Sequence, residues 1–199
     1  MENAIEFKTI LNYTLLGGMI FVLGALIGYI GNPPDPSISS HYVYTMSYED
    51  SSVAHYLSYG TRLLTIWFFN SLLALSILTV GRLPSTLRLL CTPIGCYNGV
   101  KIGMQVPEII QTYGSKALLW SVLPHGILEL SSIFVCIGLG MMFSYKITIG
   151  KCKDLNYTCD AQINAAYHIY FTYLVPILFI AATIETFISP VVLHRVAGF

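Results

Sequence analysis

Charged residues are scarce in this chain, which has 10 Lys and Arg and 10 Asp and Glu among its 199 residues. Soluble domains contain about 25% charged residues, and so few could not cover the water-exposed surface of a chain this long. The net charge is zero, which removes the electrostatic attraction that nucleic-acid binding requires. We therefore exclude nucleic acid as a partner and expect the lipid bilayer to surround most of the chain.

The sequence also lacks the motifs that are typical of common catalytic and metal centres. Its five cysteines have no repeated spacing, so they predict neither a disulfide framework nor a zinc framework. The nucleophile motif GxSxG and the zinc motif HExxH are both missing. We expect a protein that is not an enzyme and that has no cofactor.

Hydrophobic residues make up 55% of the chain, with a mean hydropathy of +0.67. They gather in runs of about 20 residues, the length that a helix needs to cross a bilayer. This pattern predicts an all-α, multi-pass protein of the cell membrane, in which one membrane domain spans residues 1–199. The bundle is expected to have about five transmembrane segments, at residues 9–30, 61–80, 87–106, 117–143 and 165–193.

Prolines and polar residues mark the expected breaks between these segments. Residues 31–58 begin with three prolines within four residues, which remove amide donors, and contain no Lys or Arg, so they predict an extramembrane loop. Residues 107–116 are expected to form a short loop. The segment 117–143 is longer than one perpendicular span, so we predict a break near Pro124–Gly126, and a kink at Pro176 in the last segment.

The distribution of Lys and Arg predicts the orientation of the chain, because these residues concentrate on the cytoplasmic side. The bias favours a cytoplasmic N-terminus and an external C-terminus. A glycosylation sequon at Asn156, flanked by Cys152 and Cys159, favours the opposite orientation, and we give the charges more weight. Lys8, Arg82, Arg88, Lys146, Lys151 and Lys153 lie on one side, against Lys101, Lys116 and Arg195 on the other.

Glycines recur at four-residue intervals in two of the segments. Gly95, Gly99 and Gly103 form a double GxxxG pattern, and Gly24 and Gly28 form a single one. Glycines at this spacing lie on one helix face and let two helices approach closely in lipid. We interpret both sets as packing faces, the alternative being a chance pattern in glycine-rich helices.

Three ionisable residues, His125, Glu129 and Glu185, fall inside predicted spans. Such groups are costly in hydrocarbon and usually face the protein interior. His125 and Glu129 are four residues apart and share a helix face. Glu185 lies at a similar depth in the next, antiparallel segment, so we expect the three to meet, with Asn70 and Asn98 as hydrogen-bond partners.

Three interpretations of this group remain open. It could be a buried polar network that fixes how the helices pack, a pathway for protons or cations, or a metal site. His125 and Glu129 are candidate metal ligands because a histidine and a glutamate one turn apart can bind the same ion. One histidine and two glutamates make a small ligand set, however, and the sequence has no HExxH motif.

Four stretches of the sequence resemble the stage II sporulation protein M family, in the order in which that family has them. The most specific is LPHGILEL, residues 123–130, which resembles the family's LPHG-x-x-E-L pattern. The resemblance extends over Thr61–Pro190. The other stretches are WFFNSLLAL with Asn70, CYNGVKIG with Asn98, Gly99 and Gly103, and IAATIETFISP with Glu185 and Pro190.

This resemblance implies a multispan membrane protein of a kind found in bacteria and archaea. In spore formers the family member anchors cell-wall hydrolases during engulfment. We accordingly expect a scaffold or a component of a membrane complex, with other membrane proteins or a second copy of the chain as partners. The alternative is a transporter or channel for protons, small ions or lipids that uses the His/Glu group, and a third possibility is an intramembrane metalloenzyme.

Overall fold

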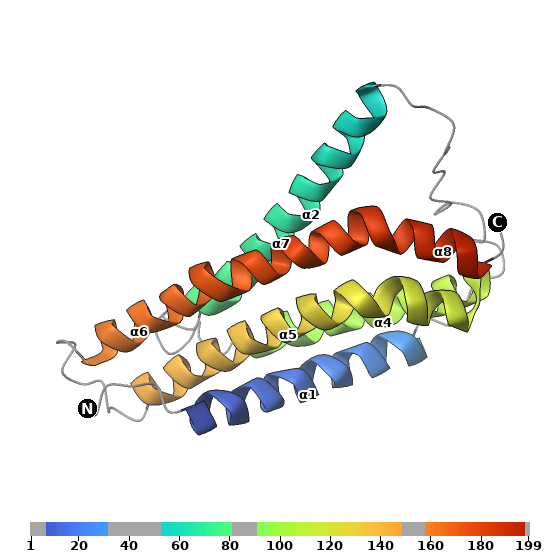
Figure 1. Ribbon diagram of the computed structural model, residues 1–199. Coiled ribbons are helices and arrows are strands. Elements are labelled where there is room, and N and C mark those ends of the chain that lie inside the picture. The colour runs from blue at the N-terminus through green and yellow to red at the C-terminus, as the bar shows by residue number, and fades with distance from the viewer. Residues whose placement is uncertain (1–6, 32–52, 81–90, 149–157, 198–199) are drawn as a thin grey trace.

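The structure is a computed structural model that describes residues 7–31, 53–80, 91–148 and 158–197 (Figure 1). The described residues form helices and contain no strand, which confirms the predicted all-α bundle. We refer to residues 158–197 together as the C-terminal helix. The elements are α1 (Phe7–Gly31), α2 (Val53–Val80), α4 (Cys91–Tyr113), α5 (Ser115–Thr148), α6 (Thr158–Ile169), η1 (Tyr170–Leu174), α7 (Val175–Thr183), η2 (Ile184–Ile188) and α8 (Ser189–Ala197).

Four of the described helices are long and apolar enough to cross a membrane, at Lys8–Gly31, Ser58–Val80, Val122–Met142 and Ile163–Val192. The described part of the predicted third span, α4, is not among them, since it contains Lys101 within a less apolar run. It nevertheless runs alongside the others, and the helices alternate in direction along the bundle (Figure 1). The result agrees with a protein of about five spans.

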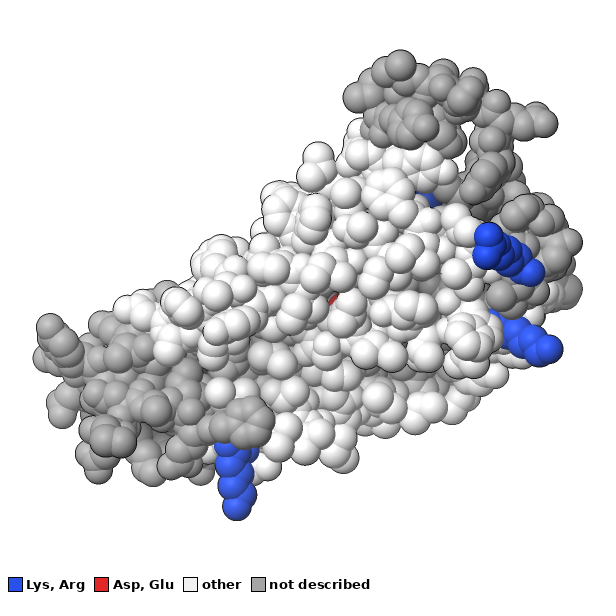
Figure 2. All heavy atoms as spheres, in the orientation of Figure 1, with Lys and Arg blue, Asp and Glu red and all other residues white. Residues whose placement is uncertain are grey.

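Helix α5 lies between two groups of helices (Figure 1). On one side it packs against α1 and α4, and on the other it packs against α2 and the C-terminal helix. The first half of α2 diverges from the C-terminal helix. On the face shown in Figure 2, the described residues carry few charges, and their Lys and Arg side chains lie toward the ends of the bundle. The largest wholly buried apolar side chains include Ile77, Leu78, Ile137, Leu139, Met142 and Leu178.

Two connections are shorter than the sequence predicts. Residues 107–113 continue α4 through Pro107, so the described connection to α5 is the single residue Gly114. Gly114 has a φ of 82°, a left-handed conformation that glycine adopts without strain, and its amide donates to Ile110 O at 2.9 Å. Likewise α2 begins at Val53, inside the predicted loop, while residues 32–52 lie outside the described part, as do Cys152 and Asn156.

The break predicted near Pro124–Gly126 does not occur, because α5 runs unbroken from Ser115 to Thr148. A proline removes only one amide donor from a helix, and membrane helices tolerate this where neighbouring groups satisfy the freed carbonyl. Gly126 has open space around it apart from Val122 of its own helix. One continuous helix therefore carries His125 and Glu129.

The C-terminal helix widens into a π-helical turn at two places, η1 and η2. Each five-residue π segment ends two residues before a proline, Pro176 after η1 and Pro190 after η2. Proline cannot donate to the carbonyl four residues earlier and its ring crowds that carbonyl, so a locally wider turn relieves both defects. The helix thus passes Pro176, where the sequence predicts a kink, by means of a π turn.

Helices α1 and α4 meet through glycines on both sides, which we call the glycine seam: Gly24, Gly28, Gly99 and Gly103. A Cβ atom on any of the four would overlap a main-chain carbonyl of the opposite helix, those of Cys96, Val100, Phe21 and Ala25 respectively. The two backbones are thus in direct contact. Gly95 faces a different neighbour, because its added Cβ would lie 2.9 Å from Ile137 Cδ1 on α5.

Candidate functional site

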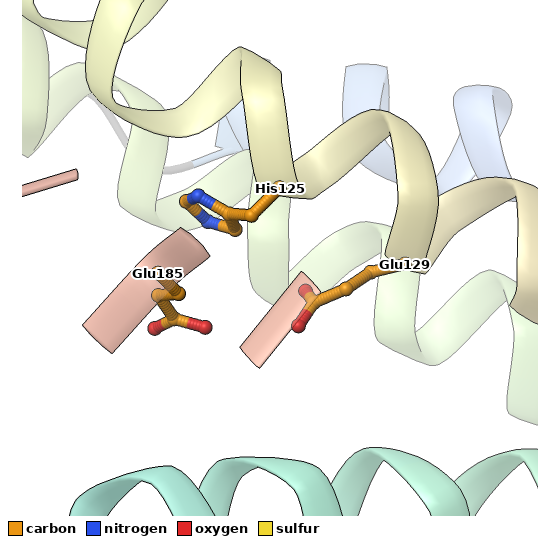
Figure 3. A group of neighbouring side chains, drawn as sticks. All are labelled: His125, Glu129 and Glu185. Carbon is orange, nitrogen blue, oxygen red and sulfur yellow. The ribbon is translucent and has the colours of Figure 1, made fainter. Parts of the chain in front are cut away.

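His125, Glu129 and Glu185 lie together between α5 and the C-terminal helix (Figure 3). One ligand-type atom from each lies within 4.8 Å of the others, and all three side chains are half-buried. His125 and Glu129 project from successive turns of α5, and Glu185 projects toward them from η2. The structure thus brings together the three ionisable residues that the sequence places at similar depth. We call these three residues the polar cluster.

Asn70 adds α2 to this site. Its Nδ2 donates a hydrogen bond to Glu129 Oε1 at 2.5 Å. A hydrogen bond to a carboxylate is short and strong when the acceptor is ionised, and the bond fixes one oxygen of Glu129 in place. Three helices that are distant in sequence therefore converge on this carboxyl group.

Ser189, which the sequence analysis did not single out, contacts the histidine. Its Oγ lies 3.0 Å from His125 Nδ1 and its side chain is buried. Ser189 follows Glu185 by one helical turn, and His125 precedes Glu129 by one turn. In antiparallel helices these spacings pair Glu129 with Glu185 and His125 with Ser189. The one-turn spacing between Glu185 and Ser189 was therefore a feature of the sequence from which the contact with His125 could have been predicted.

Arg62 was also missed, and it is the cationic member of the site. This half-buried side chain on α2 interacts electrostatically with Glu185, which in turn interacts electrostatically with Glu129. Arg62 stands at the very start of the predicted second span, where a basic residue ordinarily belongs to the membrane surface. Nothing in the periodicity of α2 showed that it would lie opposite Glu185.

Asn98, predicted to partner the ionisable residues, forms its hydrogen bond elsewhere. Its Nδ2 donates to Ile94 O of its own helix at 2.8 Å. Asn98 is adjacent to Gly99 on α4, the helix that packs most closely against α1. Its amide is therefore used within α4.

Further polar contacts continue between α2 and the C-terminal helix, away from the polar cluster. Tyr170 donates its hydroxyl to Ser71 O at 2.7 Å, and Thr79 Oγ1 lies 3.3 Å from Tyr167 OH. Ser71 Oγ is buried without a hydrogen-bond partner among the described residues. These four residues with Asn70 form what we call the polar seam, which extends from the polar cluster toward the opposite end of the bundle.

The depth of the site follows from helix geometry. Measured from Val122, where the candidate span begins, His125 lies about 5 Å and Glu129 about 10 Å along α5. The polar cluster is thus inside the membrane-spanning region, nearer the end at which α5 starts. Among the described residues drawn in Figure 2, acidic atoms appear only as a small spot in the middle of the face, away from the Lys and Arg side chains.

The sequence matches the family Stage II sporulation protein M over residues 15–190. The chain belongs to that family. The matched range includes the polar cluster, Asn70, Arg62 and the polar seam, so the resemblance read from LPHGILEL and the other stretches is confirmed. No curated protein and no solved structure matches the chain. Membership in the stage II sporulation protein M family, together with the apolar helices, makes this chain an integral membrane protein of that type.

Proposed function

We propose that this protein conducts or transports a small cation, a proton or a metal ion, and that the polar cluster is its binding site. The observation that carries the proposal is the convergence of His125, Glu129 and Glu185 within 4.8 Å inside the membrane-spanning segments. Ionisable side chains at such depth are costly, and in membrane proteins they commonly mark ion pathways and proton relays. A polar network that only fixed helix packing would need hydrogen bonds and no ionisable groups. Uncharged Asn and Gln side chains would supply those hydrogen bonds.

The charge balance of the site supports a cation as the ligand. Glu129 and Glu185 are close enough to repel each other in a medium of low dielectric constant. Arg62 supplies one positive charge beside Glu185. Two ionised carboxylates with one arginine leave a negative charge, which a proton or a cation neutralises when it binds and restores when it leaves.

The polar seam supports a route beyond the polar cluster. Asn70 contacts Glu129, and the adjacent Ser71 and the hydroxyl groups of Tyr170, Tyr167 and Thr79 follow toward the far end. Hydroxyl groups both donate and accept hydrogen bonds, so they suit proton transfer and weak coordination of a passing cation. Elsewhere along α2, exposed apolar side chains such as Phe68 and Phe69 offer no such groups.

Reconstitution into liposomes tests this proposal. We expect the purified protein to increase the flux of protons or divalent cations, reported by a dye trapped inside, above that of protein-free liposomes. Glu129→Gln keeps the size of the side chain and its hydrogen bond with Asn70, so it should fold and lose at least about tenfold in flux. Ser131→Ala is the matched control, because Ser131 is exposed on α5 and donates its hydroxyl to Leu128 O of its own helix. Equal flux in Glu129→Gln and the wild type would contradict the proposal.

A scaffold function, which the family resemblance implies, is the second proposal. It is favoured by one face of α2, where Leu64, Phe68 and Phe69 are 55%, 57% and 61% exposed. A membrane helix of a partner or of a second copy would pack there. Single-molecule subunit counting in native membranes tests it: Phe68→Ala should reduce the assembly, whereas Glu129→Gln should leave it intact. An unchanged assembly in Phe68→Ala would contradict a scaffold that uses this face.

A further inference from the structure

We propose that the polar cluster binds a first-row divalent transition-metal ion, such as Zn²⁺ or Mn²⁺, through His125, Glu129 and Glu185. The inference deepens the proposed function, on which it rests, by naming the class of cation. Among the described residues, these three form the one group of His, Cys, Asp or Glu side chains arranged to share an ion. The site contains a nitrogen ligand, which distinguishes it from the all-oxygen sites that Ca²⁺ and Mg²⁺ prefer.

The geometry requires only a small contraction. The three ligand atoms lie within 4.8 Å of one another, whereas bonds of about 2.0–2.2 Å to zinc place tetrahedral ligands roughly 3.4 Å apart. Glutamate side chains are long, and small rotations of Glu129 and Glu185 toward His125 close that difference. Three protein ligands would leave further coordination positions for water, which an ion that enters and leaves requires.

Neighbouring hydrogen bonds match those that orient ligands in metal sites. Metal-binding carboxylates and histidines are usually held by a second hydrogen bond made away from the ion. Asn70 holds Glu129 through Oε1, which leaves the other carboxylate oxygen for the ion. Ser189 Oγ lies 3.0 Å from His125 Nδ1, so a proton on Nδ1 that is donated to Ser189 gives Nε2 a lone pair for coordination.

The local backbone also suits a binding site. Glu185 belongs to η2, where the helix is π-helical, and single π turns within α-helices are frequent at functional sites. Thr186, the next residue, is fully buried, and its Oγ1 has no hydrogen-bond partner among the described residues. Thr183, three residues earlier, instead donates its hydroxyl to Phe179 O at 2.8 Å.

Direct metal binding to the purified full chain in detergent tests the site. After treatment with a chelator, the protein is titrated with Zn²⁺ and Mn²⁺ by calorimetry, and with Co²⁺ by visible absorption, which reports the coordination geometry. We expect one ion per chain, and weaker binding of Ca²⁺ and Mg²⁺. Glu129→Gln and Glu185→Gln should each weaken binding of Zn²⁺ by about tenfold or more, and Asn70→Ala by about 10–100-fold.

His168→Asn is the matched control, because His168 is an exposed histidine on α6, away from the polar cluster. It should leave the affinity for Zn²⁺ and the Co²⁺ spectrum unchanged. Size-exclusion profiles and helical circular dichroism establish that every variant is folded. Failure of the folded wild type to bind any of the three transition metals would overturn the inference, and so would equal binding in the wild type, Glu129→Gln and Glu185→Gln.

The outcome is separable from that of the transport proposal. Metal binding that depends on Glu129 and Glu185, without cation flux in liposomes, would retain the metal site and end the transport proposal. Proton flux that depends on Glu129, in a protein that binds no metal, would end the metal site and retain the transport proposal.

Discussion

Asn70 on α2 donates a hydrogen bond to the carboxyl group of Glu129 on α5, at 2.5 Å. This contact makes α2 a structural part of the polar cluster, although α2 packs less extensively against α5 than α1 does. The bond also determines which oxygen of Glu129 remains available to Glu185, to a proton or to an ion.

Asn70→Ala should lower the free energy of unfolding in detergent by about 1–3 kcal/mol, because a half-buried carboxyl group loses its hydrogen-bond donor. Thermal unfolding followed by circular dichroism measures the change. Ser76→Ala is the control, since Ser76 is exposed on the same helix and donates its hydroxyl to Leu72 O. If both variants unfold at the same temperature as the wild type, the bond between Asn70 and Glu129 does not stabilise the fold.

Two substitutions of Glu129 should separate its role in folding from its role in function. Glu129→Gln retains an acceptor for Asn70 and should unfold close to the wild-type temperature. Glu129→Leu leaves the Asn70 amide without its partner, and we expect a loss of about 1–3 kcal/mol. Thermal unfolding of both purified variants tests this, and a Gln variant that is as unstable as the Leu variant would show that the charge itself holds the helices together.

The glycine seam predicts a position-dependent response to one added methyl group. Gly99→Ala places a Cβ against Phe21 O, a main-chain atom that cannot move without shifting α1, so we expect a cost of about 1–3 kcal/mol. Gly95→Ala meets only the end of the Ile137 side chain, which can rotate, and should cost less. Ile102→Leu, at an exposed position of α4, should be nearly neutral. Equal stability of the Gly99 and Gly95 variants in thermal unfolding would contradict close packing of α1 against α4.

Orientation can be tested at two exposed positions at opposite ends of the bundle, Lys8 near the start of α1 and Ser115 at the turn between α4 and α5. In a variant whose five native cysteines are replaced, an impermeant maleimide added to intact cells should label Ser115→Cys. Lys8→Cys should react only after the membrane is permeabilised, since the excess of Lys and Arg predicts a cytoplasmic N-terminus. The reverse labelling pattern would place the N-terminus outside.

The sequence alone was sufficient for the fold class, the family and the meeting of His125, Glu129 and Glu185. Apolar runs of the right length show which segments enter a membrane. Ionisable residues within them must then find partners, and antiparallel depth indicates which ones are available. These inferences succeed because they depend on spacing along one helix and on the cost of charge in hydrocarbon.

The other contacts of the site depend on the rotation of each helix about its axis, which the spacing of residues along the sequence does not determine. Arg62 and Ser189 face the polar cluster only because α2 and the C-terminal helix pack against α5 as they do. Asn98, equally polar, faces its own helix backbone instead. The predicted loop at Pro107 and the predicted break at Pro124 were wrong for another reason. Both prolines lie within helices, because the loss of a single amide donor is tolerable where neighbouring groups compensate.

The π turn at η2 also has a mechanical meaning for the C-terminal helix. A π turn accommodates one residue more than an α turn does, so converting Ile184–Ile188 to α geometry would rotate the residues on one side by about 100° relative to the other. Glu185 lies within that segment, so the rotation would carry its carboxyl group away from Glu129 without unfolding the helix. Because Pro190 favours the wider turn, the π winding holds the carboxyl group of Glu185 on the side of the helix that faces His125 and Glu129.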